Sequence, residues 1–380
     1  MVAPMAPRHH VILIPGFFGF ARLGDLRYFL GVEDMLAEQL AARGIDARVQ
    51  EVMTLPTASI RHRAARVLEV IEQACADDDG PVHLVGHSTG GLDARLAVAP
   101  TASLPTAFDS AGAYERVTSL VTISAPHAGT PLATYYGSAM GKPLLQVLAV
   151  ATVYILRYGR LPLGAALKLG GLFAKADDFL GFDNTVVDQL YNELLADFNE
   201  GRREAVMQFL ADVQADQSLV FQLTPAALDL FNATSADPSG IRYASVVTRA
   251  ERPRIGRALG HGADPYAQSM YLVYSGLWWL ASRSRIEDMP ELGLAQHQSL
   301  KRAYGDLPDR YDSDGVVPTL SQVWGPVIHA ARGDHLDVVG HYGQTRQVEG
   351  IYADWLPTAS GYDDDAFERL WSAVATFIAG

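Results

Sequence analysis

Short apolar runs and amphipathic segments alternate along most of this chain of 380 residues. Brief apolar runs bounded by Gly, Pro or charged residues predict buried strands, and apolar positions spaced three and four apart predict helices. The expected strands cover 11–14, 47–53, 82–85, 117–124, 241–248 and 326–330, and the expected core helices cover 33–43, 59–76, 89–99 and 364–378. Because strands separated by helices pair in parallel, the pattern favours an α/β fold with a doubly wound, mostly parallel sheet.

The alternation stops in the middle of the chain, where helical patterns follow one another without strands. These helices are expected at 144–158, 161–173 and 186–198. We therefore predict an inserted helical cap, or lid, at 132–232, and a core made of 8–131 and 233–380. A second, smaller helical insert is expected at 251–310. The apolar run 143–156 is shorter than the roughly 20 residues that span a bilayer, so no transmembrane segment is expected.

Charge and cysteine content narrow the class of protein. The formal net charge is −13 without any basic run, which argues against a nucleic-acid partner and against docking on anionic lipid through charge. Cys75 is the single cysteine, so no disulfide within the chain is expected. The residues before the first expected strand lack the pattern of a signal peptide. A cytoplasmic location and secretion with the leader removed both stay open.

Ser88 lies in the motif Gly-His-Ser-Thr-Gly-Gly at 86–91. An expected strand ends just before this motif, and an expected helix begins within it. A nucleophilic serine needs its hydroxyl lifted clear of the backbone at such a sharp turn, and flanking glycines permit the close approach of the chain. The first amides of the helix then lie near the place where negative charge develops on a substrate. The motif therefore predicts Ser88 as a nucleophile.

Two expected loops in the last part of the chain supply an acid and a base. Asp314 lies in Ser-Asp-Gly-Val-Val-Pro, and His335 lies in Asp-His-Leu-Asp-Val-Val-Gly. A carboxylate that accepts the imidazole Nδ1 proton fixes the tautomer that a general base needs, and Asp314 and His335 fit these two roles best. The alternatives that stay open are Asp312, Asp334 and Asp337 for the acid and His329 and His341 for the base.

These motifs, together with the glycine-rich turn Pro-Gly-Phe-Phe-Gly-Phe at 15–20, give the chain a resemblance to a family. It resembles the bacterial true lipases and related esterases of the α/β-hydrolase fold, whose triad follows the chain order Ser, Asp, His. The resemblance implies that Ser88 is the nucleophile, His335 the general base and Asp314 its orienting acid. The resemblance covers the core but not residues 132–220, so it stays open whether the helical cap covers the site or only packs against the core.

The same resemblance assigns roles to three further residues, Phe17, Thr89 and Asp337. The backbone amides of Phe17 and Thr89 would form the oxyanion hole. The chain departs from the family at Pro15, where these lipases usually carry histidine. Asp337 matches a position that ligates a structural calcium ion in those lipases, and oxygen ligands of this kind suit that ion. This chain carries His341 where those lipases offer an amide oxygen, so a loop-capping role for Asp337 stays open.

The expected function is hydrolysis of lipid-like carboxylic esters by a serine hydrolase, either a triacylglycerol lipase or an esterase, through an acyl-enzyme and without an organic cofactor. Phe18 and Leu148 are expected to line the substrate pocket. The expected partners are an ester substrate and a lipid interface. Two alternatives stay open: an acyltransferase that uses the same triad, and a non-catalytic lipid-binding protein on a hydrolase fold. Acyl-chain length and alcohol preference are not decided by the sequence.

Overall fold

The computed structural model describes residues 7–17, 27–77, 79–108, 115–138, 141–174, 184–198, 200–254, 264–343, 347–348, 351–352, 354, 356, 358 and 360–380. Within these residues one sheet has the order β2-β1-β3-β4-β5-β6, and every neighbouring pair in it is parallel. Its strands are β1 (His9–Ile14), β2 (Ala47–Glu51), β3 (Val82–His87), β4 (Val117–Ile123), β5 (Arg242–Arg249) and β6 (Val327–Arg332). The α/β prediction and the expected strands are confirmed, with small shifts at the strand ends.

The order of the strands indicates which end of the sheet carries the site. The chain runs from β1 to its neighbour β2 and then crosses back to β3 on the other side of β1. Open parallel sheets bind ligands at the carboxyl ends of the strands beside such a reversal. Because Leu13 of β1 pairs with Val85 of β3, the loop after β1 and the turn after β3 leave the sheet side by side.

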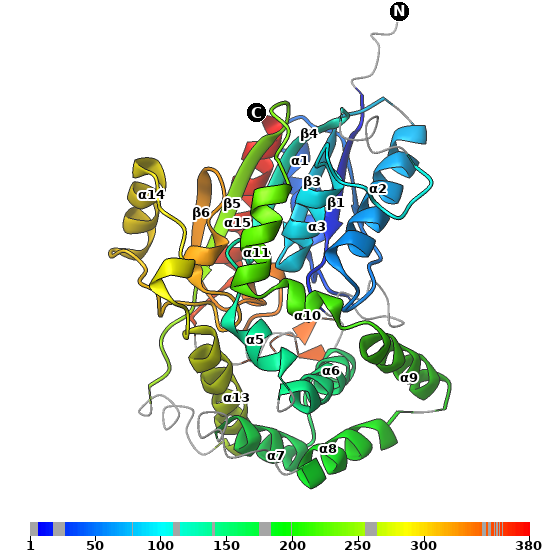
Figure 1. Ribbon diagram of the computed structural model, residues 1–380, viewed down its shortest axis with the longest axis vertical. Helices are drawn as coiled ribbons and strands as arrows, with labels where there is room; N and C mark the ends of the chain where they lie inside the picture. The colour runs from blue at the N-terminus through cyan, green and yellow to red at the C-terminus, as the bar shows by residue number, and fades with distance from the viewer. Residues whose placement is uncertain are drawn as a thin grey trace, which may run out of the picture.

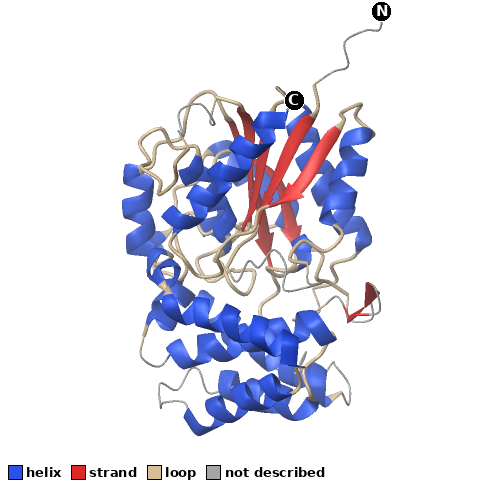
Figure 2. Ribbon diagram, turned by 90° about the vertical axis from the view of Figure 1, so that its right-hand side faces the viewer, coloured by secondary structure: helices blue, strands red, loops and turns tan. Residues whose placement is uncertain are grey.

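Helices cover both faces of this sheet (Figures 1 and 2). Helices α1 (Val32–Ala41) and α15 (Asp364–Ala379) pack on one face, where they share an apolar cluster with alternate residues of β1. Helices α2 (Ile60–Asp77) and α3 (Thr89–Ala97) pack on the other face. Strands buried on both faces explain why these segments read as continuous apolar runs in the sequence.

The C-terminal helix α15 illustrates how the sequence specifies these elements. Its first turn is capped by Asp363, whose carboxylate accepts a hydrogen bond from the Ala366 amide at 2.8 Å. Its buried side chains recur at helical spacing and are Phe367, Leu370, Trp371, Val374, Ala375 and Ile378. One continuous stripe therefore faces the sheet, as expected for a surface helix of a layered domain.

A helical layer lies beneath the carboxyl ends of the strands (Figure 2). One apolar cluster joins α5 (Pro131–Gly137), α6 (Gly141–Tyr158), α7 (Leu163–Ala174), α8 (Asn184–Ala196), α9 (Glu200–Ala215) and α13 (Pro265–Ala281). We call these helices the cap. Although α13 is distant from α7 in the sequence, the two helices pack closely: a methyl group in place of the Gly170 hydrogen would lie 2.7 Å from the Ser269 carbonyl oxygen. The proposed domain bounds, 132–232 and 251–310, stay predictions.

Three helices outside the cap contact the core. In α11 (Pro225–Thr234), Leu228 packs with Ile60 and Leu92, and α10 (Ser218–Gln222) contributes to the same cluster. Helix α14 (Leu294–Tyr304) packs against β6. The sequence pattern did not predict α5, α9, α10, α11 or α14, nor the short antiparallel pair β7 (Gln347–Val348) and β8 (Ile351–Tyr352).

No single helix among the described residues is long and apolar enough to cross a membrane. Helix α5 and residues 141–155 reach that length and composition only as a pair, across a bend of 107°.

Candidate active site

Ser88 occupies the sharp turn that the sequence predicts between β3 and α3. Its backbone has φ 54° and ψ −129°, a conformation that residues other than glycine rarely adopt. The turn is close-packed: a methyl group in place of the Gly86 hydrogen would lie 2.4 Å from the Gly90 carbonyl oxygen, and one on Gly90 would lie 2.2 Å from that of Ile14. Only glycine fits at these two positions, which explains the motif around Ser88.

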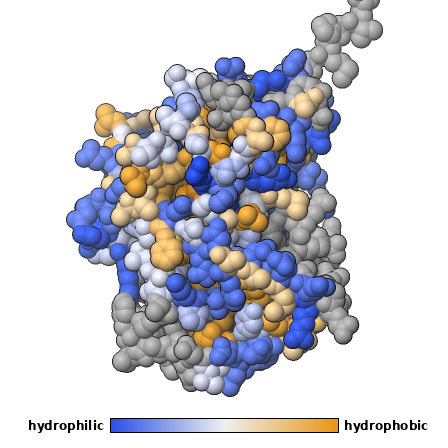
Figure 3. Space-filling model, turned by 45° about the vertical axis from the view of Figure 1, so that its right-hand side comes forward, coloured by the Kyte–Doolittle hydropathy of each residue, from blue (hydrophilic) through white to orange (hydrophobic). Residues whose placement is uncertain are grey.

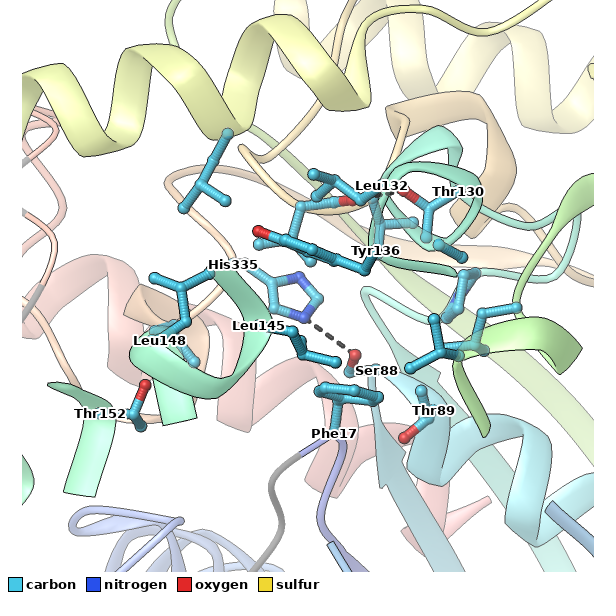
Figure 4. Close-up of a pocket in the computed structure, with 18 of the residues that line it drawn as sticks. Phe17, Ser88, Thr89, Thr130, Leu132, Tyr136, Leu145, Leu148, Thr152 and His335 are labelled. Atoms are coloured by element: carbon cyan, nitrogen blue, oxygen red, sulfur yellow. Dashed lines mark hydrogen bonds between the residues drawn. The ribbon is translucent and has the colours of Figure 1, made fainter. Parts of the chain in front are cut away.

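The structure brings Ser88, His335 and Asp314 together in one hydrogen-bonded chain. The Ser88 Oγ lies 2.9 Å from His335 Nε2, as the dashed line in Figure 4 marks. His335 Nδ1 lies 2.7 Å from Asp314 Oδ2. Because the carboxylate only accepts, Nδ1 carries the proton and Nε2 is left as the acceptor that faces the serine hydroxyl. This arrangement can withdraw a proton from Ser88.

Asp314 is fully buried, yet it is surrounded by donors. Its Oδ1 accepts from the amides of Val316 at 2.9 Å and Val317 at 2.8 Å. Its Oδ2 accepts from Thr248 Oγ1 at 2.9 Å and Gln322 Nε2 at 3.1 Å, in addition to His335. Hydrogen bonds to the charged form compensate for the lost hydration of a buried carboxylate. The side chains of Thr248 and Gln322 were not anticipated from the sequence.

The alternative acids have other partners. Asp312 pairs with Arg249 at 3.1 Å and with Arg252 at 3.0 Å. Asp334 accepts from two backbone amides and from Thr358 Oγ1 at 3.0 Å. Neither carboxylate is hydrogen-bonded to His335, whose acidic partner in the structure is Asp314.

The alternative bases have other partners, although His341 lines the same cavity as Ser88. His341 Nε2 donates to the Tyr28 carbonyl oxygen at 2.9 Å, which holds its ring against the backbone. His329 is part of β6, where burial lowers its pKa. The histidine that contacts Ser88 is His335, in the loop that follows β6.

Arg63 supports the loop that carries Phe17. The guanidinium of Arg63 is fully buried and donates to the carbonyl oxygens of Pro15 at 2.7 Å and Gly16 at 3.1 Å. It also forms an ion pair with Asp93 of α3 at 2.8 Å. The loop after β1 is thereby tied to the helix that follows Ser88. The lipases that the chain resembles usually carry histidine at the position of Pro15. In this chain the loop is supported by Arg63 instead.

His87 forms a second connection, between this loop and the backbone of His335. Burial lowers the pKa of His87 well below its usual value, so its ring is neutral. Its Nε2 donates to the His335 carbonyl oxygen at 2.9 Å, and its Nδ1 accepts from the Tyr28 hydroxyl at 2.7 Å. The Tyr28 oxygen in turn interacts with the Gly16 amide. The residue before the nucleophile, which the sequence left without a role, thus braces the backbone of His335.

An apolar cavity of about 160 Å³ opens above Ser88 and His335. Phe17 and Thr89, the two proposed oxyanion residues, lie in its wall beside Ser88 (Figure 4). Leu148, predicted to contact substrate, also lines the cavity and is 7% exposed. Phe18, the other predicted lining residue, lies outside the described residues.

Asp337, the candidate calcium ligand, instead holds the loop that follows His335. Its Oδ2 accepts from the Asp334 amide at 2.8 Å and from Ser360 Oγ at 2.8 Å. Among the residues that the structure describes, no group of three or more His, Cys, Asp or Glu side chains is arranged to hold a metal ion. These bonds are those expected of a loop-capping carboxylate, and the calcium prediction stays untested.

Chelation tests the role of Asp337. If Asp337 caps the loop by hydrogen bonds alone, EDTA should leave both ester hydrolysis and the melting temperature unchanged, because no bound ion is removed. Thermal melting and turnover are measured with EDTA and again after calcium is added back. A fall on chelation that calcium reverses would show that a structural ion stabilises the folded state by mass action, and would restore the calcium prediction.

With the fold and the site described, the chain can be compared with known proteins. The solved structure of lipase 1 from Pelosinus fermentans is 18% identical and has a TM-score of 0.54, with 98% of this chain and 99% of that chain covered. EstA from Clostridium botulinum is 16% identical and has a TM-score of 0.53, with 98% of this chain and 87% of that chain covered. These likenesses, together with the parallel sheet, show that the chain has the α/β-hydrolase fold.

The match found by sequence covers a smaller part of the chain. Residues 5–160, which include β1, Arg63 and Ser88, match the family described as "Putative serine esterase (DUF676)". No curated protein sequence matches the chain. The resemblance to bacterial lipases and esterases is thus confirmed for the fold, and the family match indicates a serine esterase.

Proposed function

We propose that this protein hydrolyses lipid-like carboxylic esters through an acyl-enzyme. The observation that carries the proposal is the hydrogen-bonded chain from Ser88 through His335 to Asp314 at the floor of an apolar cavity. A nucleophile, a base and an orienting acid within hydrogen-bond reach of one another are the components of serine-hydrolase chemistry.

Each step of the reaction uses a group in this geometry. His335 Nε2 takes the proton of Ser88 as Oγ attacks the ester carbonyl carbon, and the resulting oxyanion is stabilised by the amides of Phe17 and Thr89. The protonated His335 then donates its proton to the departing alcohol oxygen. Water repeats the sequence on the acyl-enzyme, which releases the acid and regenerates Ser88.

The acyl chain is proposed to run along α6. Leu145, Leu148 and Thr152 line the cavity from this helix. Their spacing of three and four residues places them on one helical face. In Figure 4 they lead away from Ser88. A channel with walls of this kind binds an acyl chain by the burial of apolar area, at roughly 25 cal/mol per Å².

The surface of the cap supports a lipid interface as partner. Figure 3 shows apolar side chains among hydrophilic ones on the face that it presents. The large exposed apolar side chains of the cap include Leu163, Leu167, Met207 and Trp279, and Leu163 is 47% exposed. Such groups gain free energy when they leave water for a lipid surface.

Replacing Leu148 tests the acyl channel. In Leu148→Asp, a carboxylate in the apolar wall should lower kcat/KM for octanoate esters about tenfold more than for acetate esters, because only the longer chain reaches position 148. Leu148→Trp should give the same selectivity by filling the channel, and it remains informative if the charged variant does not fold. The measurement is hydrolysis of a series of p-nitrophenyl esters.

The matched control is Leu230→Asp, which places the same charge at an exposed position of α11, outside the cap, and should leave the chain-length series unchanged. If both Leu148 variants lose kcat/KM equally on acetate and octanoate esters, this side of α6 packs in the hydrophobic core and does not contact the acyl chain. Turnover of an emulsified triglyceride that fails to exceed turnover of soluble short esters would restrict the function to that of an esterase.

A further inference from the structure

Tyr136 of α5 presents a buried hydroxyl without a partner. The side chain is 9% exposed and lines the cavity above Ser88. Its hydroxyl oxygen makes no hydrogen bond to any described residue. A buried hydroxyl normally has a partner, because leaving it unpaired costs the free energy of its lost hydration. An unpaired donor beside a nucleophile suggests that the partner is supplied by the substrate.

Three other polar side chains of the cavity wall are already engaged with protein partners. Thr130 Oγ1 donates to the Val316 carbonyl oxygen at 2.7 Å. Ser88 is bonded to His335, and Tyr28 to His87. Burial raises the pKa of Tyr136, so its hydroxyl keeps its proton over the working pH range and remains a donor. In an otherwise apolar cavity this donor can discriminate between substrates that carry an acceptor oxygen and substrates that do not.

The position of Tyr136 indicates which part of the ester it faces. In Figure 4 Phe17 and Tyr136 lie on opposite sides of the pair formed by Ser88 and His335, and the Tyr136 hydroxyl is turned toward the side of His335. The carbonyl oxygen of a bound ester is directed at the Phe17 side, where the oxyanion forms. The alcohol oxygen is directed at His335, which protonates it. Tyr136 therefore lies on the alcohol side.

We propose that the Tyr136 hydroxyl donates a hydrogen bond to a second oxygen in the alcohol part of the substrate, which selects esters of polyols or ether alcohols over esters of simple alkanols. This inference rests on the proposed ester hydrolysis. The second oxygen belongs to a neighbouring hydroxyl, ether or ester group, and all three can accept from a phenol.

The test compares two substrates that differ by one atom. Butyl butyrate and 2-methoxyethyl butyrate have the same length, but the second carries an ether oxygen in place of one methylene. In Tyr136→Phe, kcat/KM for the methoxyethyl ester should fall about tenfold, the size expected for one lost hydrogen bond, while kcat/KM for the butyl ester should stay within about twofold. The ratio between the two esters, measured in both proteins, is the readout.

Tyr135→Phe is the matched control, because it also removes a phenolic hydroxyl from α5. Tyr135 does not line the cavity. It should leave the ratio unchanged. The melting temperature of Tyr136→Phe should equal or exceed that of the wild type, since the variant loses an unpaired buried hydroxyl. An unchanged ratio in Tyr136→Phe, or equal losses on both esters, would overturn the inference while ester hydrolysis stands. Absence of turnover on both esters in the wild type would instead contradict the proposed function.

Discussion

Ser88→Ala is expected to lower the hydrolysis of short p-nitrophenyl esters by more than about a thousandfold, because the members of such a triad act as a unit. The substitution removes the oxygen that attacks the ester and keeps the Cβ, so the backbone at φ 54° is unchanged. The melting temperature should stay within a few degrees of the wild type, since the loss of one hydroxyl leaves no cavity in the core and contributes little to folding. Turnover and thermal melting are measured on the same preparation.

Labelling with a fluorophosphonate tests whether Ser88 itself reacts, independently of how well an ester binds. The wild type should be labelled at Ser88, and Ser88→Ala should not be labelled. Ser372→Ala is a suitable control, because Ser372 lies in α15 and its hydroxyl accepts only a peripheral bond from Arg43. A Ser88→Ala protein that keeps more than about one-thousandth of the activity would show that another residue is the nucleophile.

Asp314→Asn is expected to lower turnover by about 10³- to 10⁴-fold without changing the shape of the site. The amides of Val316 and Val317 donate to Oδ1, so the oxygen of an asparagine at 314 would stay at that place. Its NH₂ group would then face His335 Nδ1 and donate to it. The imidazole proton would move to Nε2, and His335 would lose the lone pair that accepts the proton of Ser88.

Parallel variants make this prediction specific. Asp312→Asn and Asp334→Asn remove carboxylates of other networks, and they should affect the melting temperature more than turnover. The assignment of the acid is wrong if Asp314→Asn keeps near-full turnover while either of the other two variants loses it. Steady-state kinetics on one soluble ester suffices to decide.

The sequence predicted the parts of the site that depend on local constraints. The turn at Ser88 could be located because glycines at 86 and 90 are required by close backbone contacts, and because a strand and a helix flank it. The four central strands β1, β3, β4 and β5 could be located because most of their residues are buried, which makes them continuous apolar runs. Helices α9 and α14 escaped prediction, since their apolar positions are interspersed with charged ones and their burial depends on distant partners.

What could not be predicted depends on contacts between distant segments. Arg63 reaches the carbonyl oxygen of Pro15 from 48 positions further along the chain, and no local pattern distinguishes it from other arginines of α2. The choice of Asp314 among several aspartates required the position of His335 relative to β5 and β6. The unpaired hydroxyl of Tyr136 follows only from the packing of the cap against the core.

The separation of the site residues along the chain also bears on how the protein is synthesised. Ser88 and His335 are 247 positions apart, and the backbone of His335 is held by His87. During translation Ser88 leaves the ribosome long before His335, so a nascent chain ending before position 335 lacks the proposed general base. The proposed ester hydrolysis would therefore report that synthesis has passed His335 and that these two distant segments have come together, which makes it a direct assay of refolding yield.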